Sequence, residues 1–248
     1  MAFSCYRNVV ESLSTPRTDP WDIMLTWIGT NYWSIGKMYK HGFLWVATAE
    51  DANIYKIKQD GTILDVFSQP AIVGFPLSRG LAMDINGFLW VIDSWADKVF
   101  KLKQDGTILN SFASPDTNTH GIGFDNNGFL WVTERVSDKI YKLKQDGTIL
   151  NSFASADESP YGIVADNNGF LWFYEDNTFK IHKINQRGID VAAPIAIPGD
   201  GTDLTIDNNG FLWIADPMDS KIYKLKQDGT ILNSFASPAA SPQGLAIA

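Results

Sequence analysis

Cysteine, long apolar runs and a leader-like N-terminus are all scarce or missing in this sequence. Cys5 is the single cysteine in 248 residues, so an intramolecular disulfide is excluded, and this usage fits a reducing compartment. No apolar run approaches the roughly 18 residues that a membrane-spanning helix needs. The N-terminus lacks a basic stretch followed by an apolar segment, so we expect no signal peptide. We therefore expect no membrane insertion, and the location stays open between the cytoplasm and a virus particle.

Positive charge is scarce as well. The chain carries 20 Lys and Arg against 28 Asp and Glu, a formal net charge of -8, which argues against nucleic acid as a partner. No window has an apolar stripe of helical period long enough to compete with strands. A Ser-His-Asp order, a glycine-rich phosphate loop and a Cys/His metal spacing are all missing. The sequence thus offers no strong catalytic motif.

What the sequence does contain is a repeat. The letters GFLW begin at residues 42, 87, 128, 169 and 210, and the segment KLKQDGTILNSFAS occurs unchanged from residues 101, 142 and 224. With 45% hydrophobic residues, the chain has enough apolar surface for a buried core. A fixed period of this size indicates a repeat architecture.

Each repeat divides into four short extended segments. In the copy that starts at residue 128 they are GFLWVTE, DKIYKLK, TILNSFA and YGIVAD, separated by Asn-Asn-Gly, Gln-Asp-Gly and Ser/Asp-rich joints. Asn-Gly and Asp-Gly supply the positive φ angles of tight hairpins. Four antiparallel strands per repeat are typical of a β-propeller blade. A solenoid of β-hairpins is the alternative.

Counting repeats predicts six blades in a single all-β domain over residues 1–248. The expected repeats are 1–41, 42–86, 87–127, 128–168, 169–209 and 210–248. The last strand, residues 244–248, is expected to become the innermost strand of the blade built by residues 2–29, which would close the ring and remove two sheet edges. The runner-up has five blades, with residues 1–41 as an N-terminal arm.

The loops on the two faces of such a propeller differ. One face carries DNNG or QDG in nearly every repeat, whereas the loops on the opposite face, the variable face, differ between repeats. Loops on a rigid scaffold commonly carry function, so we expect a protein or small-molecule ligand to bind the variable face. The candidate binding residues are Trp95, Phe75, Arg79, Tyr161 and Trp33. The tryptophans within GFLW are instead expected to pack between blades.

A ring of carboxylates ends the second strand of four neighbouring repeats. Its members are Asp93, Glu134, Glu175 and Asp216. Oxygen ligands suit hard cations, so a Ca²⁺ or Mg²⁺ site is one interpretation. Solvated loop residues, or ion pairs with neighbours such as Arg135, are the other. Cofactors are otherwise not expected.

His120 and Glu134 are the one pair with catalytic character, at the same end of adjacent strands in one repeat. An imidazole near a carboxylate can act as a general base. The segments THGIGFDNNGFLWVTERVSDKIYKL and SPYGIVADNNGFLWFYE resemble NHL repeats and, more closely, streptogramin (virginiamycin B) lyases. The resemblance implies catalytic roles for His120 and Glu134 with Mg²⁺ assisting. Those lyases have seven blades, and they use a further histidine that Arg79 or Tyr161 replaces here.

Three functions follow from these residues. The leading one is a non-catalytic propeller that binds a ligand or protein through the variable face, for which display on a virus particle or a cell surface would be suitable. A metal-assisted lyase or lactonase-like enzyme is the second. The third is a structural module whose copied repeats serve stability alone.

Overall fold

The computed structural model describes residues 25–28, 32–35, 42–70, 78–197 and 199–248, the first two ranges without their side chains. Contacts divide the chain into two compact units, Met1–His41 and Gly42–Ala248. In the first unit, β1 (Leu25–Ile28) pairs with β2 (Tyr32–Ile35) as an antiparallel hairpin. The second unit contains every other strand of the described residues and is considered by itself below.

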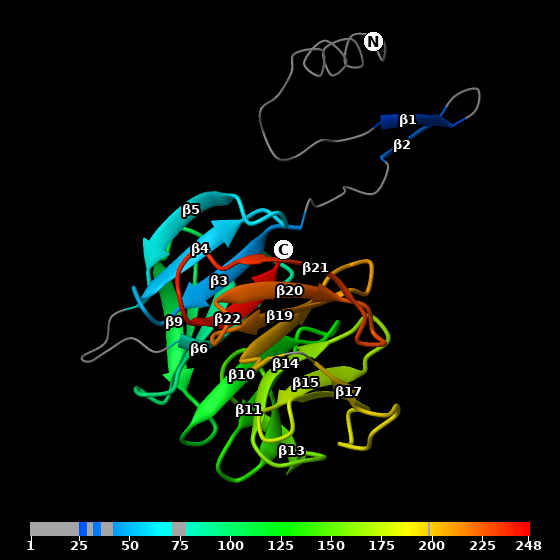
Figure 1. Ribbon diagram of the computed structural model, residues 1–248. Helices are drawn as coiled ribbons and strands as arrows, with labels where there is room; N and C mark the ends of the chain where they lie inside the picture. Colours follow the sequence, from blue (N-terminus) through cyan, green and yellow to red (C-terminus); the bar gives the residue numbers. More distant parts are fainter. Residues whose placement is uncertain (1–24, 29–31, 36–41, 71–77, 198) are drawn as a thin grey trace. The chain divides into compact units, whose positions relative to one another are not determined.

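The second unit is a β-propeller of five four-stranded antiparallel blades (Figure 1). We number the blades I to V and list the strands of each from the innermost outward: blade I, β22 (Pro242–Ile247), β3 (Leu44–Thr48), β4 (Asn53–Ile57) and β5 (Ile63–Ser68); blade II, β6 (Ser78–Met83), β7 (Leu89–Asp93), β8 (Lys98–Leu102) and β9 (Ile108–Ala113); blade III, β10 (Thr119–Phe124), β11 (Leu130–Glu134), β12 (Lys139–Leu143) and β13 (Ile149–Ala154); blade IV, β14 (Pro160–Ala165), β15 (Leu171–Glu175), β16 (Lys180–Ile184) and β17 (Ile195–Ala196); blade V, β18 (Asp203–Ile206), β19 (Leu212–Asp216), β20 (Lys221–Leu225) and β21 (Ile231–Ala236).

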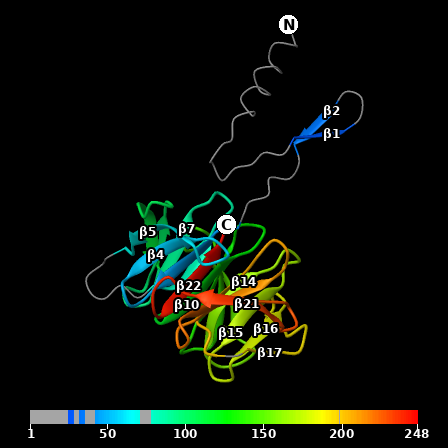
Figure 2. The ribbon, with the colours of Figure 1, turned by 45° about the horizontal axis from the view of Figure 1, so that its top comes forward.

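The prediction of six blades is wrong, and the five-blade alternative is the closer one. β22 pairs with β3, not with a blade built by residues 2–29, and both ends of the second unit therefore meet in blade I (Figure 2). Leu245 faces Val46 just as Leu81 faces Val91 in blade II, so the closing strand repeats the register of the other blades. The ring is closed without residues 1–41.

Glycine at the innermost strands gives a physical reason for this closure. The innermost strands approach one another closely, so that a Cβ added at Gly121 would lie 2.3 Å from the carbonyl oxygen of Tyr161. The closing strand supplies Gly244 at this repeat position, whereas the segment preceding residue 42 carries Ile35 there. At Gly244 itself an added Cβ would lie 2.9 Å from the Cβ of Leu81, so glycine fits this position of blade I better than a β-branched side chain. The C-terminal strand therefore fits blade I better.

The core consists of five clusters, each lying between two adjacent blades. The GFLW tryptophans are at most 2% exposed and pack on the following blade: Trp45, Trp90, Trp131, Trp172 and Trp213. In blades II to V the indole N–H donates to an aspartate that also pairs with a lysine, as in Trp131 and Lys142 with Asp125. In blade I the indole nitrogen of Trp45 is buried without a partner. The predicted packing role of these tryptophans is confirmed.

Candidate functional site at the variable face

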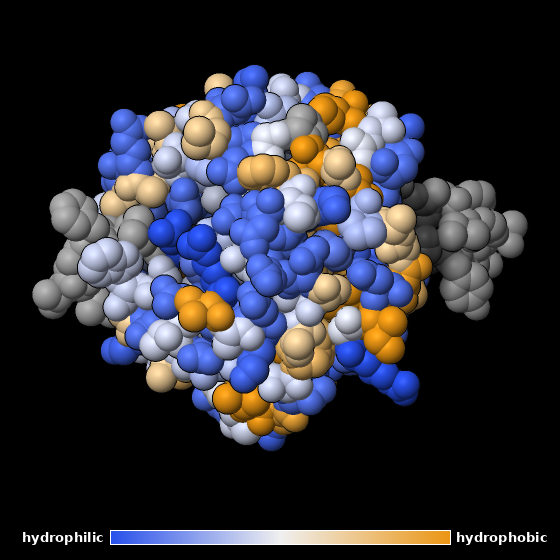
Figure 3. All heavy atoms as spheres, turned by 60° about the horizontal axis from the view of Figure 1, so that its bottom comes forward, coloured by the Kyte–Doolittle hydropathy of each residue, from blue (hydrophilic) through white to orange (hydrophobic). Residues whose placement is uncertain are grey.

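Five side chains, one per blade, surround the axis of the ring where the innermost strands begin on the variable face. They are Arg79, His120, Tyr161, Thr202 and Gln243, spaced by 41 residues. Thr202 donates its hydroxyl to the carbonyl of Pro242, which leaves it little freedom to bind anything else. Figure 3 turns this end of the molecule toward the viewer, and its middle is mostly hydrophilic. The asymmetry of the ring therefore rests on the other four residues.

His120 is buried and neutral at physiological pH. Its ring meets Tyr161 edge-on, with 4.4 Å between centroids, and its Nδ1 has no hydrogen-bond partner. Burial, together with the charges of Arg79 and Arg135, lowers the pKa of His120 to about 3. An imidazole in these surroundings is a poor proton acceptor.

Two guanidinium groups stand beside this ring. Arg79, half-buried, donates from Nη1 to Oε1 of Gln243 at 2.9 Å, while its Nε is buried without a partner. Burial also lowers the pKa of Arg79 from its usual value. The guanidinium of Arg135 lies over the ring of Tyr161, 5.3 Å from the centroid. The His120–Tyr161 pair is therefore flanked by two cations from blades II and III.

Carboxylates also lie near Tyr161. Asp176 pairs with Arg135 at 3.6 Å, and the hydroxyl of Tyr174 donates to Asp200 at 3.4 Å. Burial raises the pKa of Asp200, and the nearby charge of Asp176 raises it further. Burial and the charge of Asp176 also raise the pKa of Tyr161. This part of the variable face thus has a basic side in blades II and III and an acidic side in blades IV and V.

The four carboxylates proposed from the sequence as a metal site do not gather around one point. Each caps the turn that follows its own strand: Asp93 accepts from the amides of residues 95 and 96, Glu134 from those of 136 and 137, Glu175 from those of 177 and 178, and Asp216 from those of 218 and 219. Within the described ranges, no three of them are close enough to share an ion. Turn capping accounts for their recurrence.

His120 and Glu134 are on adjacent strands, but no hydrogen bond joins their side chains. Glu134 accepts from two turn amides and from the hydroxyl of Ser137. A pair whose carboxylate is so engaged, and whose imidazole lies near the charges of Arg79 and Arg135, does not fit the oxygen-rich, anionic setting that Mg²⁺ requires. We therefore derive no chemical step through Mg²⁺ at this pair.

The remaining sequence-predicted binding residues are dispersed. Trp95 is 72% exposed in the turn after β7. Phe75 lies outside the described residues, and Trp33 belongs to β2 of the first unit, where side chains are not described. The structure brings only Arg79 and Tyr161 of this set to one place.

Sequence reasoning missed Asp203, which stands at the repeat position that is glycine in the other four blades. Its carboxylate lies at the axis and accepts the amides of Leu81 at 3.1 Å and Leu245 at 2.8 Å. Burial raises the pKa of Asp203 well above its ordinary value. The signal was a single departure from a glycine repeated every 41 residues. Asp203 joins three blades and blocks the axis.

A model of the virginiamycin B lyase family matches residues 110–248, more than half of the sequence. The chain belongs to the virginiamycin B lyase family. This confirms the resemblance recognised in the repeats. A comparison with curated proteins found no match.

Solved structures support the same fold. A streptogramin B lyase is 24% identical, with a TM-score of 0.53 over 91% of this chain and 71% of that one. Virginiamycin B lyase from Staphylococcus aureus is 21% identical, with a TM-score of 0.51 over 80% and 71%. A chain of the nidogen/laminin complex is 19% identical, with a TM-score of 0.54 over 87% and 89%. These likenesses establish the propeller.

Among the described residues, no helix is long and apolar enough to cross a membrane.

Proposed function

We propose that the chain is a non-catalytic propeller that binds a small ligand with an anionic group at the variable face, between Arg79 and Arg135. The observation that carries this proposal is the convergence of two guanidinium groups on the buried His120–Tyr161 pair. Guanidinium groups recognise carboxylates by paired, charge-assisted hydrogen bonds.

Two unpartnered donor or acceptor atoms support a ligand at this place. Nε of Arg79 and Nδ1 of His120 are both buried without hydrogen-bond partners. A buried polar atom left unpaired costs about 1–3 kcal/mol, so a ligand that bonds either atom gains affinity. The nearby Asp176 and Asp200 would favour a ligand that also carries a donor or a positive charge.

The test is calorimetric titration with succinate and with an N-acetyl amino acid, using their uncharged amides as matched controls. We expect saturable binding of the carboxylates alone and a loss of about 1.5–3 kcal/mol in Arg135→Ala, the usual size of a hydrogen bond to a charged group. Arg135 is exposed, so this variant should fold normally. Equal binding of acids and amides would refute the proposal.

A lyase is the second candidate, favoured by membership in the family and by His120 and Glu134 at the matching strand positions. The low pKa of His120 and the engaged carboxylate of Glu134 make this pair a weak base. A solved relative was crystallised with quinupristin, which supplies a probe. Turnover of quinupristin that disappears in His120→Ala would replace the binding function by the lyase.

A further inference from the structure

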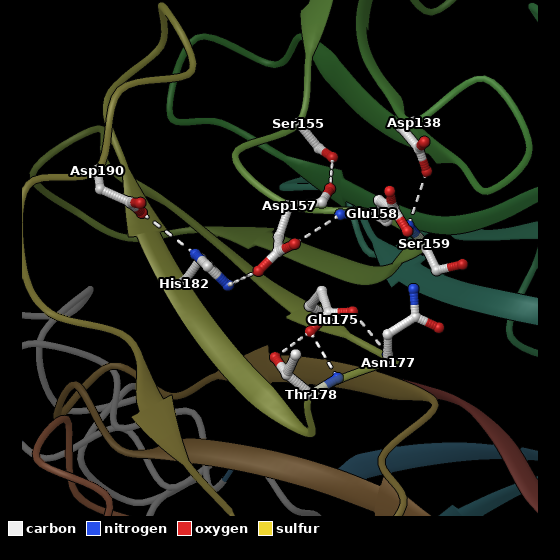
Figure 4. A network of polar contacts seen from close by, with 10 residues as sticks. All are labelled: Asp138, Ser155, Asp157, Glu158, Ser159, Glu175, Asn177, Thr178, His182 and Asp190. Carbon is white, nitrogen blue, oxygen red and sulfur yellow. Dashed lines mark hydrogen bonds and ion pairs between the residues drawn. The ribbon is translucent and has the colours of Figure 1, made fainter.

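A second polar cluster lies in blade IV, apart from the ring around Tyr161. Asp157 from the loop before β14, Glu175 at the end of β15 and His182 in β16 each turn a potential ligand atom inward (Figure 4). These atoms all lie within 4.8 Å of one another. Three consecutive elements of one blade thus bring an imidazole and two carboxylates together.

The imidazole of His182 is held from two sides. It stacks on Phe173 with 4.8 Å between centroids and an interplanar angle of 12°. Its Nδ1 lies 3.3 Å from Oδ1 of Asp190, an acceptor, so the ring proton belongs on Nδ1. A carboxylate on the distal nitrogen is the usual support of a metal-binding histidine.

The other ring nitrogen has nothing to bond. Nε2 of His182 is buried, has no hydrogen-bond partner and faces Oδ2 of Asp157 at 4.0 Å. That separation is too long for a hydrogen bond. Two bonds of about 2 Å to one tetrahedral Zn²⁺ place the ligand atoms roughly 3.3 Å apart, so a small movement of the exposed Asp157 side chain would bring both atoms to one ion.

Glu175 has a free acceptor site for an ion, and Asp157 can be reached from solvent. Glu175 is fully buried and accepts one bond at Oε1 and two at Oε2, which leaves an acceptor site on Oε1. The Asp157 side chain is 42% exposed, so an ion can enter from solvent. Among the described residues, no Lys or Arg forms an ion pair with Asp157, Glu175 or Asp190. The cluster therefore has uncompensated negative charge.

We infer that Asp157, Glu175 and His182 form a site for a divalent transition-metal ion of the Zn²⁺ class, with Asp190 as the positioning residue. One nitrogen and two oxygen ligands with an open fourth position suit Zn²⁺ better than Ca²⁺, which takes six to eight oxygens. The site is distinct from the four-carboxylate ring expected from the sequence and shares only Glu175 with it.

Blade III provides the matched comparison without a metal. Tyr141 occupies the position of His182, and its hydroxyl donates to Asp116, the counterpart of Asp157, at 3.1 Å. Tyrosine fills the gap that the shorter imidazole leaves open. Tyrosine also stands at this position in blades I and V, as Tyr55 and Tyr223. His182→Tyr is therefore compatible with the blade.

The experiment is calorimetric titration of the full chain with Zn²⁺ after dialysis against a chelator. We expect one ion per chain that requires His182, loss of that ion in both His182→Tyr and Asp157→Asn, and about 10–100-fold weaker binding in Asp190→Asn. Melting in chelator should be unchanged in Asp157→Asn, because its side chain lies at the surface.

Two results would overturn the inference. One is the absence of saturable Zn²⁺ binding to the wild type. The other is equal binding by the wild type and Asp157→Asn, which would assign the ion to other residues such as Cys5 or His41. A His182→Tyr variant that fails to fold would leave Asp157→Asn to decide.

Discussion

Blades III and IV carry the same two residue types in exchanged places. Blade III has histidine on the innermost strand and tyrosine on the third strand, at positions 120 and 141, whereas blade IV has tyrosine at 161 and histidine at 182. The backbone register of the first three strands is the same in the two blades. His120 faces two guanidinium groups, while His182 faces three carboxylates.

This exchange teaches that the copied scaffold does not determine what a histidine does. The position within the blade selects the neighbours, and the neighbours select the charge of the ligand. On the innermost strand the surroundings favour an anion. On the third strand they favour a cation. The predictions below test this contrast.

The largest expected effect concerns His120. Unlike Tyr161, which occupies the same repeat position in blade IV, a histidine can gain a proton between pH 7 and pH 5. Unfolded histidine has a pKa near 6.5, and the folded value is about 3, so the unfolded state binds more protons between these values. The contribution of neutral His120 to the free energy of unfolding is fully present above about pH 6.5. It falls as the pH drops through that window, by about 2 kcal/mol at pH 5.

His120→Gln, which introduces the residue of blade I at this position, should remove that loss. The measurement is urea unfolding of both proteins between pH 7.5 and pH 5. Parallel pH profiles would show that His120 is protonated in the folded state, contrary to the account.

A smaller effect is expected in blade I, which lacks the carboxylate that blades III and IV place beside their tryptophans. Ala248 occupies the repeat position of Asp125 and Asp166, and its amide bonds Phe43 in the same register. Ala248→Asp should give the buried indole of Trp45 an acceptor and Lys56 an ion-pair partner, stabilising the fold by about 1 kcal/mol.

Thermal unfolding of Ala248→Asp against Ala248→Asn checks this expectation. The amide can accept the indole hydrogen but cannot pair with Lys56, so it separates the two contributions. Melting at or below the wild-type temperature in both variants would contradict the repeat equivalence.

Much of the fold could be predicted from the sequence because the repeat encodes local structure. The Asn-Gly and Asp-Gly turns and the buried tryptophans lie where the pattern indicates. The blade count was wrong because the spacing of residues 1–41 resembles a repeat, while the obstacle to that blade is steric. Only the structure shows how little room blade I leaves for a side chain at the repeat position of Ile35.

The candidate sites were predictable in part. Arg79, His120 and Tyr161 share one repeat position, and that spacing was enough to place them together. The partners of His182 come from separate loops, and Asp190 reaches it because β17 is short and its approach irregular. Asp203 required knowing how closely the innermost strands pack. Such contacts depend on side-chain direction, which the period alone does not give.

The most direct test transfers the arrangement of blade IV into blade III. Tyr141→His with Ile149→Asp reproduces His182 and Asp190 beside Asp116 and Glu134, which already match Asp157 and Glu175. Zn²⁺ stoichiometry is then measured by calorimetry on the wild type and on the double variant. The account predicts one ion per wild-type chain and two per variant chain. A folded variant that still binds one ion, or none, would contradict it.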